Sequence, residues 1–214
     1  PEAPVALSPT VPHPTIGYVF RPGTVVGYLG AEIVVNRFHQ RSPDRDEVDV
    51  LVLGDSVVAG TNVPEGANVG AVLEQATGLR VATIACDGWA PGNLLAYVEA
   101  FGTFGASKAL LVLNTHDACS VMGENYPALP EVVSDQALRD IADLLALLGA
   151  EGVDVTILLH HEATHPEDRA GDEAILALGA MPTHFAPECY ADFIHLAAAG
   201  HAALADVLAH AQDP

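Results

Sequence analysis

Three side chains of this sequence have the types needed for nucleophilic attack on an acyl carbon. Ser56 ends a Gly-Asp-Ser step that follows the apolar run 48–53, and Asp192 and His195 stand three positions apart far downstream. Such chemistry needs a hydroxyl at the end of a strand, an imidazole that takes its proton, and a carboxylate that holds the imidazole in one tautomer. A single loop can present both Asp192 and His195, so the sequence predicts that these two side chains meet Ser56.

A parallel sheet is predicted to position these groups. Apolar, strand-like runs alternate with helical patterns, which is typical of a parallel sheet covered by helices on both faces. The predicted strands are 48–53, 79–85, 109–113 and 153–159, and the predicted helices are 69–77, 93–101, 136–148 and 197–209. The polar candidates that follow the four strands are, in order, Ser56, Gly88, His116 with Asp117, and His160 with His161. Because ligands bind at the carboxyl ends of such strands, we expect these candidates at one edge of the sheet.

The first part of the chain has a different pattern. Residues 1–15 contain five prolines, which restrict φ and remove backbone donors, so this stretch is predicted to be a Pro-rich linker. Residues 16–46 contain short β-favouring pieces separated by glycine and proline, which predicts a β-rich N-terminal extension. The charged stretch 40–47 is predicted to be an exposed connection. The catalytic domain is expected to cover 47–214.

Two sequence blocks resemble those of the SGNH hydrolases, also called GDSL-type esterases. They are Val50-Leu51-Val52-Leu53-Gly54-Asp55-Ser56 and Asp192-Phe193-Ile194-His195-Leu196, and the resemblance covers about residues 48–210. It implies a three-layer α/β/α sandwich with a mostly parallel sheet, of the SGNH or flavodoxin-like type. It also implies that Ser56 is the nucleophile, that His195 is the base and that Asp192 orients His195. No metal or organic cofactor is implied.

The same resemblance implies an oxyanion hole. In the family it is formed by the N–H of the serine, the N–H of a glycine after the second strand and an asparagine side chain after the third strand. Gly88 fits the glycine, since a residue without Cβ lets its N–H approach the oxyanion closely. In the third block, Leu113-Asn114-Thr115-His116-Asp117, His116 occupies the usual asparagine position. An imidazole N–H can also donate to an oxyanion, and Asn114 is the alternative donor.

A competing motif lies after the fourth predicted strand. His161-Glu162-Ala163-Thr164-His165 matches the HExxH pattern, in which two histidines one helical turn apart bind zinc and the glutamate activates water. That arrangement needs a helix, and Pro166 disfavours a helical conformation at the preceding residue. We therefore predict no metal site here, and His161 is instead a candidate substrate contact. Trp89, beside Gly88, is either a stacking platform for a sugar or a core anchor, and the core anchor is slightly favoured.

The composition argues against several partner classes. The chain has 28 acidic and 8 basic residues and a formal net charge of −20, so we expect neither nucleic acid nor an anionic membrane as a partner. No segment reaches the roughly 20 consecutive apolar residues of a membrane span. The three cysteines are widely spaced, which favours neither a disulfide framework nor a zinc site. A secreted or periplasmic location is expected, with any signal or anchor outside this chain, and the oligomeric state stays open.

These features predict a serine esterase that hydrolyses small acyl esters through an acyl-enzyme. The expected substrate is a small-molecule or carbohydrate ester, with acetyl as the acyl group. One alternative is a carbohydrate O-acyltransferase, which uses the same triad but passes the acyl group to a sugar hydroxyl. Another is a carbohydrate-binding domain that keeps the fold without catalysis. A zinc metallopeptidase based on residues 161–165 is the least favoured alternative.

Overall fold

The structure of the chain is a computed structural model that describes residues 9–27, 30–124, 132–163 and 170–210. Its centre is a five-stranded sheet in the order β6-β5-β7-β8-β9, and every pair of neighbouring strands is parallel. The strands are β5 (Val50–Gly54), β6 (Val81–Ala85), β7 (Lys108–Leu113), β8 (Asp154–His160) and β9 (Met181–Thr183). The predicted fold class, a three-layer α/β/α sandwich, is thereby confirmed.

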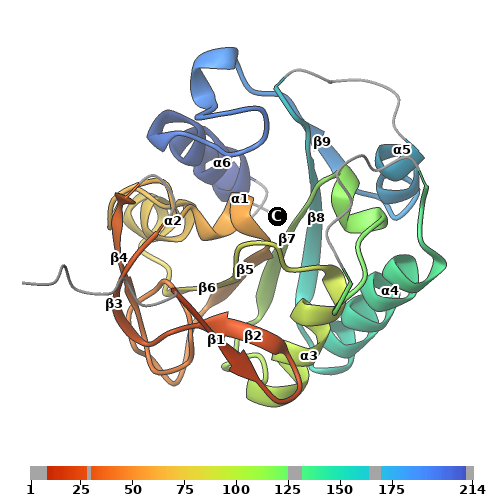
Figure 1. Cartoon of the computed structure of the whole chain (residues 1–214), viewed down its shortest axis with the longest axis horizontal. Helices are drawn as coiled ribbons and strands as arrows, with labels where there is room; N and C mark the ends of the chain where they lie inside the picture. Colours follow the sequence, from red (N-terminus) through yellow and green to blue (C-terminus); the bar gives the residue numbers. More distant parts are fainter. Residues whose placement is uncertain (1–8, 28–29, 125–131, 164–169, 211–214) are drawn as a thin grey trace, which may run out of the picture.

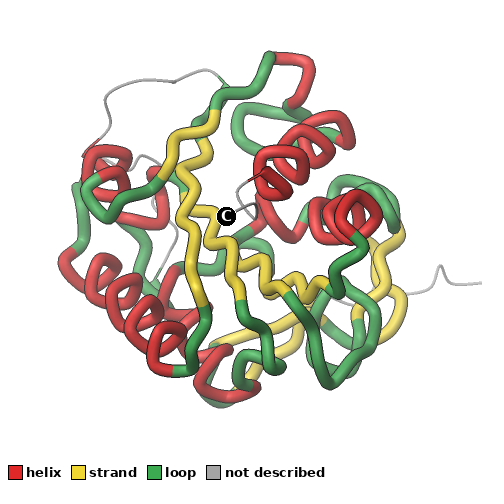
Figure 2. The backbone as a smooth tube through the Cα atoms, turned by 180° about the vertical axis from the view of Figure 1, so that it is seen from behind, coloured by secondary structure: helices red, strands yellow, loops and turns green. Residues whose placement is uncertain are grey.

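Helices cover both faces of this sheet (Figures 1 and 2). On one side lie α1 (Ser56–Ala59), α2 (Val69–Thr77) and α6 (Ala198–His210), and on the other lie α3 (Pro91–Phe101), α4 (Asp135–Ala150) and α5 (Ala170–Leu176). Two short 3₁₀ segments, η2 (Thr115–Ala118) and η3 (Pro187–Cys189), follow β7 and β9. None of the helices in the described ranges combines the length and apolar character needed to span a bilayer.

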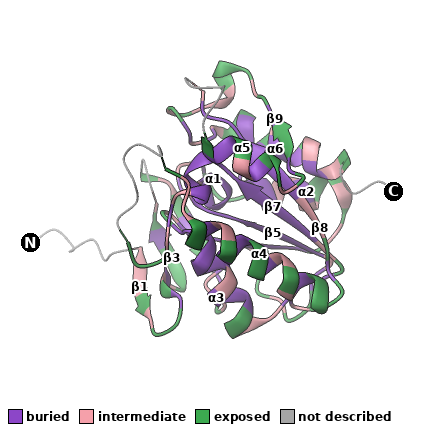
Figure 3. Cartoon of the chain, turned by 90° about the vertical axis from the view of Figure 1, so that its right-hand side faces the viewer, coloured by how far each residue is buried: buried purple, intermediate pink, exposed green. Residues whose placement is uncertain are grey.

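The central strands form because their residues are apolar on both faces. All five residues of β5 and of β6 are buried, as are the last five of β7, so the sheet is hidden between the helical layers (Figure 3). Such continuous apolar runs are what a sheet covered on both sides requires. Side-chain caps fix where the helices begin: Asn68 accepts the N–H of Ala71 at the start of α2, and Ser134 accepts the N–H of Ala137 at the start of α4.

Two hairpins precede the sheet. β1 (Thr10–His13) pairs with β2 (Gly17–Phe20), and β3 (Gly23–Val26) pairs with β4 (Glu32–Val35), both antiparallel. Their apolar residues join the main core, with Ile16, Val19 and Ile33 completely buried. The N-terminal extension is therefore packed onto the same core as the sheet.

Two expectations for this region are wrong. Residues 10–13, which we assigned to a linker, form strand β1, and Pro12 is tolerated there opposite Tyr18 because an edge strand does not need every backbone donor. The connection that begins at residue 40 is not exposed at its start, since Gln40 and Arg41 are 2% and 1% exposed. Polar side chains can be buried when they find hydrogen-bond partners, and both of these do. Residues 1–8 of the predicted linker lie outside the described residues.

Candidate active site

The nucleophile candidate lies where β5 meets α1. Ser56 is the first residue of α1, and Asp55 before it caps the helix by accepting the N–H of Val57 at 2.9 Å. The turn is tight, because a Cβ at Gly54 would lie 2.5 Å from Cγ2 of Val58 and 3.0 Å from the carbonyl oxygen of Val112. Only glycine fits there, which accounts for the Gly-Asp-Ser step.

The structure brings Ser56, His195 and Asp192 into one hydrogen-bonded chain. Ser56 Oγ lies 3.0 Å from Nε2 of His195, although the two residues are 139 positions apart, and Nδ1 of His195 lies 2.8 Å from Oδ2 of Asp192. The other carboxylate oxygen of Asp192 accepts the N–H groups of Ile194, at 3.0 Å, and of His195, at 2.8 Å. This is the geometry in which a carboxylate orients an imidazole and the imidazole can take a serine proton.

Asp192 is suited to remain ionised. Partial burial alone would raise the pKa of its carboxyl group, but the hydrogen bonds from the backbone of Ile194 and His195 and from the His195 ring lower the pKa overall. The side chains of His195 and Asp192 are 24% and 28% exposed. Both side chains are therefore accessible from solvent. The hydrogen bonds from Ile194 and His195 favour the charged form of the Asp192 carboxylate.

Other side chains fix the loop that carries His195. The carbonyl oxygen of Ile194 accepts the ring Nε2–H of His160 at 2.9 Å, and that of Leu196 accepts the amide of Asn62 at 2.8 Å. His160 is the last residue of β8, and Asn62 follows α1. Burial lowers the pKa of His160 to about 4, so its ring is neutral at pH 7 and carries its proton on Nε2, the atom that faces the carbonyl.

The segment after β6 places Gly88 in the left-handed region, with φ of +72°, a conformation that favours glycine. Tyr18 of the extension donates its hydroxyl hydrogen to the carbonyl of Asp87 at 2.9 Å, and a Cβ on Gly88 would lie 3.1 Å from that hydroxyl oxygen. The carboxylate of Asp87 accepts the hydroxyl of Thr61. The peptide that would supply the Gly88 N–H is thus held from both sides.

The segment that follows β7 is hydrogen-bonded to the Gly-Asp-Ser turn. The Asn114 side chain donates from Nδ2 to Oδ2 of Asp55 at 3.0 Å and accepts the N–H of His116 at 2.9 Å. The His116 ring is buried, and its Nε2 lies 3.2 Å from Oε1 of Glu162. Asn114 is therefore used to hold the residue before the nucleophile, whereas a buried carboxylate fixes the ring of His116.

Two buried carboxyl groups lie under this part of the site. Burial raises the pKa of Asp55, and it raises that of Asp117 well above its ordinary value, with the nearby Asp55 adding to the effect on Asp117. Asp117 also accepts the N–H of Asn114 at 2.8 Å. Raised pKa values favour the neutral form of these two buried carboxyl groups.

The described part of the HExxH motif is not helical. His161 stacks on His184 with ring centroids 4.6 Å apart, its Nδ1 lies 3.4 Å from Asp172, and Glu162 faces His116. Residues 164 and 165 lie outside the described residues, and within those that are described no three His, Cys, Asp or Glu side chains form a metal-binding group. The expectation that the zinc motif lacks its helix therefore fits residues 161–163.

The two predicted substrate contacts are buried. Trp89 is 1% exposed, and its indole N–H donates to the carbonyl of Tyr18 at 2.9 Å, so the ring is a core anchor and cannot stack on a sugar. His161 is 8% exposed, and its stacking on His184 leaves little surface for a ligand. Both predictions used residue type and position after a strand, which do not distinguish a side chain that points outward from one that points into the core.

Sequence reasoning missed the residues that hold the site together, which are Tyr18, Arg41, Thr61, Asn62, His160 in its contact with Ile194, and Glu162. Each acts through a contact with a distant segment, and only Glu162 belongs to a recognisable motif, the HExxH pattern, which does not predict its contact with His116. The sequence contains only a weak indication of a role for Thr61 and Asn62. They are two polar residues that directly follow the apolar segment after Ser56.

Comparison with solved structures supports the fold assignment. The chain is similar to a G-D-S-L family protein from Desulfitobacterium hafniense DCB-2, with a TM-score of 0.57, 11% identity and coverage of 76% of this chain and 98% of that one. It is similar to a GDSL-like lipase from Bacteroides thetaiotaomicron VPI-5482, with a TM-score of 0.53, 14% identity and coverage of 79% and 90%. A third is a carbohydrate esterase family 2 enzyme with a carbohydrate-binding domain from Corynascus thermopiles (Myceliophthora fergusii), with a TM-score of 0.52, 17% identity and coverage of 79% and 66%.

These likenesses define the class of fold. The chain shares its fold with these GDSL-type proteins, and the two sequence blocks that resemble the SGNH hydrolases are the segments that meet at Ser56 and His195. No family model and no curated protein sequence matches the chain. The identities of 11–17% carry the fold alone, so the activity must be argued from the site.

Proposed function

We propose that this protein is a serine esterase that hydrolyses small acyl esters, with acetyl esters of carbohydrate as the substrate class. The observation that carries the proposal is the hydrogen-bonded chain from Ser56 through His195 to Asp192. The solved structures with this fold include a GDSL-like lipase and a carbohydrate esterase, which supports ester hydrolysis as the reaction class.

In the proposed reaction, Ser56 Oγ attacks the acyl carbon while its proton passes to Nε2 of His195. The N–H groups of Ser56 and Gly88, with a third donor from η2, stabilise the oxyanion of the tetrahedral intermediate. The C–O bond to the alcohol then breaks, and His195 gives its proton to the leaving oxygen. Water, activated by His195, attacks the acyl-enzyme, which releases the acid and restores Ser56. Asp192 holds His195 in the required tautomer throughout.

The first experiment asks whether Ser56 is activated. We expect a fluorophosphonate probe to label the wild type and not Ser56→Ala, since only a serine with an adjacent base reacts readily. Ser107→Ala, at an exposed serine elsewhere in the chain, is the matched control and should label like the wild type. An unlabelled wild type would refute the esterase and favour the non-catalytic carbohydrate-binding alternative.

A second experiment separates hydrolysis from transfer. Acetylated oligosaccharide is incubated with the protein in the presence and in the absence of an acceptor sugar, and released acetate is compared with new sugar ester. Hydrolysis predicts that acetate accounts for the consumed ester under both conditions. Transfer product that exceeds free acetate would instead support the O-acyltransferase.

Loss of activity with a chelator, together with about one zinc per chain, would support the metallopeptidase alternative.

Phe193 is the candidate contact for the alcohol part of the ester. It stands between the triad residues Asp192 and His195 in the sequence and is 53% exposed, unlike Trp89. An exposed aromatic ring at the site can contact the apolar face of a sugar. We expect Phe193→Ala to raise KM for a sugar acetate several-fold and to leave KM for ethyl acetate within about twofold. Equal changes for both substrates would contradict this role.

A further inference from the structure

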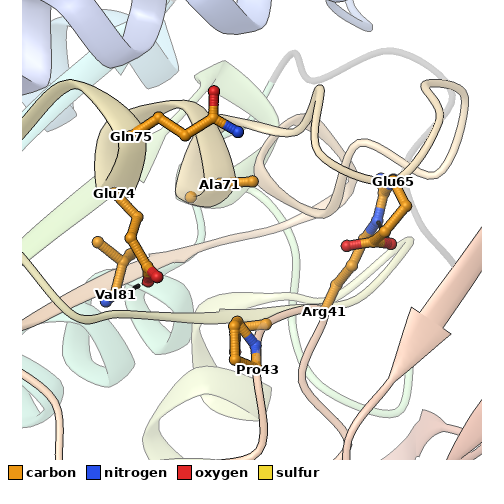
Figure 4. Close-up of a pocket in the computed structure, with 9 residues that line it drawn as sticks. Arg41, Pro43, Glu65, Ala71, Glu74, Gln75 and Val81 are labelled. Carbon is orange, nitrogen blue, oxygen red and sulfur yellow. Dashed lines mark hydrogen bonds and ion pairs between the residues drawn. The ribbon is translucent and has the colours of Figure 1, made fainter. Parts of the chain in front are cut away.

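A buried arginine from the N-terminal extension binds the chain just after the nucleophile helix. Arg41 is 1% exposed, and its guanidinium donates to the carbonyl of Ala59 at 3.1 Å, to that of Gly60, and to that of Val63 at 2.7 Å. Its Nε lies 3.4 Å from the carboxylate of Glu65. Figure 4 shows Arg41 and Glu65 next to each other at the wall of a pocket of about 150 Å³, which contains none of the triad residues.

The guanidinium is well suited to this position. Burial lowers the pKa of Arg41 and the neighbouring Glu65 opposes that change, yet an arginine remains charged at any physiological pH. A buried charge is costly unless its donors are satisfied, so the three carbonyl contacts are strongly favoured over any arrangement that breaks them. The planar fork of an arginine can reach several carbonyls at once, which the single ammonium of a lysine does less well.

The segment that Arg41 holds touches three parts of the site. We name residues 60–63 the bridging loop. Its first residue, Gly60, ends α1, the helix that begins with Ser56. Thr61 donates its hydroxyl to the carboxylate of Asp87, the residue before Gly88, with distances of 2.9 and 3.1 Å to the two oxygens. Asn62 donates to the carbonyl of Leu196 at 2.8 Å, directly after His195. The bridging loop therefore joins helix α1, the turn that carries Gly88 and the loop that carries His195.

We propose that Arg41 is a positioning residue of the active site, which acts by fixing the bridging loop and through it the alignment of Ser56, Gly88 and His195. The inference rests on the proposed esterase function and deepens it, because it makes the β-rich extension a part of the catalytic apparatus. Arg41 touches no reacting atom. Its effect is transmitted by α1 on one side and by Asn62 and Thr61 on the other.

The test compares Arg41→Met with Arg37→Met in the full chain. Arg37 comes from the same segment, but its side chain is 53% exposed and its ion pairs with Asp44 and Asp46 lie on the surface. For Arg41→Met we expect the fluorophosphonate labelling rate and kcat to fall about 10- to 100-fold with KM within about twofold, the size of effect that small misplacements cause. Arg37→Met should match the wild type in all three quantities.

Asn62→Ala provides a second variant that leaves every Arg41 contact in place. It removes only the link from the bridging loop to Leu196, so we expect a folded protein with kcat reduced about tenfold and KM unchanged. Circular dichroism and thermal unfolding establish whether each variant is folded. If Arg41→Met does not fold, Asn62→Ala decides. If Arg41→Met folds and keeps the wild-type labelling rate and kcat, the proposal is overturned. If only Asn62→Ala folds, the same result in that variant overturns it.

NMR of the His195 ring distinguishes this proposal from the esterase proposal. The chemical shifts of the ring report its contacts with Ser56 and Asp192 whether or not the protein turns over an ester. If the wild type does not react with the probe, the esterase proposal fails. The positioning role of Arg41 would still be supported if the His195 signals shift in Arg41→Met and not in Arg37→Met. Unmoved His195 signals in folded Arg41→Met and Asn62→Ala would refute positioning on their own.

Discussion

At the scale of single residues, the third oxyanion donor is the main departure from the family pattern. The structure shows different uses for the two candidates, since the Asn114 amide binds Asp55 while the His116 ring is held by Glu162. A ring fixed by a carboxylate has a defined orientation, and such preorganisation is what an oxyanion donor requires. Asn114 thus supports the turn before Ser56, and His116, which stands at the family's asparagine position, stays the predicted donor.

We therefore expect His116→Ala to lower kcat about 10²- to 10³-fold with little change in KM, the usual cost of losing one oxyanion donor. His116→Asn, which restores the residue type of the family, should retain more activity than the alanine variant. Steady-state kinetics on a simple acetate ester provide the measurement. If both variants keep the wild-type kcat, the side chain of residue 116 is not the donor.

At the scale of elements, the sequence predicted the long regular parts of the fold and missed the short ones. Helix 69–77 coincides with α2, and strand 109–113 falls within β7, because sustained apolar patterns define buried strands and helices. The elements α1, α5 and β9 were not predicted. They contain four, seven and three residues, too few for a periodic pattern to develop.

The meeting of Ser56, His195 and Asp192 could be predicted because these residues lie within recognisable blocks, whereas the contacts that support them could not. Arg41 was predicted to be exposed because a charged side chain is exposed by default, and its partners are backbone carbonyls that leave no trace in the sequence. For Trp89 the sequence left a sugar contact and a core anchor open, and the structure confirms the core anchor. Its position after a strand is visible in the sequence, but the bond from its indole to Tyr18 depends on how the extension folds back.

His160 shows how one element supports another. As the last residue of β8, it lies between the rings of Phe185 and Tyr190, with centroids 6.0 and 5.7 Å away, and it donates to Ile194 in the histidine loop. His160→Phe keeps the ring packing and removes the donor. We expect kcat to fall about tenfold and the free energy of unfolding to fall by about 1–3 kcal/mol, since the carbonyl of Ile194 loses its partner.

A second substitution at this position makes the His160 prediction specific. His160→Gln retains an N–H donor on a side chain of similar reach, so it should keep more activity than His160→Phe even though it packs less well. Kinetics and urea unfolding at pH 7 measure both effects. The role of His160 in positioning the loop would be contradicted by a phenylalanine variant that is less stable yet fully active.

At the scale of the whole molecule, the response of stability to pH depends on buried groups far apart in the sequence. His201 on α6 is completely buried, and within the described residues neither ring nitrogen has a hydrogen-bond partner. Burial, aided by the positive charges of Arg41 and nearby histidines, lowers its pKa to about 3. Because an unfolded histidine titrates near about 6.5, the unfolded chain binds more protons between these values. His201 therefore lowers the free energy of unfolding more and more as the pH falls through that window.

His201→Leu should therefore stabilise the protein. At pH 7 we expect a gain of about 1–3 kcal/mol in the free energy of unfolding, because an unbonded polar ring is replaced by an apolar side chain of similar size. The gain should grow by about 1.4 kcal/mol per pH unit between about pH 6 and pH 4. Urea unfolding at several pH values measures it. The buried carboxyl groups with raised pKa values respond in the opposite sense, but they do so in both proteins and cancel in the difference.

His210→Leu is the matched control for this prediction. It lies on the same helix with a side chain that is 75% exposed, so its effect on stability should stay within about 0.5 kcal/mol at every pH. A difference between His201→Leu and the wild type that does not vary with pH would show that His201 is not the group responsible.

The contact of Arg41 with the bridging loop also constrains the order in which the chain can fold. Synthesis proceeds from the N-terminus, so the two hairpins and Arg41 leave the ribosome before the carbonyls of residues 59–63 that will receive the guanidinium. Until then the hairpins expose apolar residues and unpaired strand edges, which are prone to aggregate. A gene shortened to begin at Val48 would avoid that hazard, yet its product would keep Ser56, His195 and Asp192 while losing the donors that Arg41 supplies to Ala59, Gly60 and Val63.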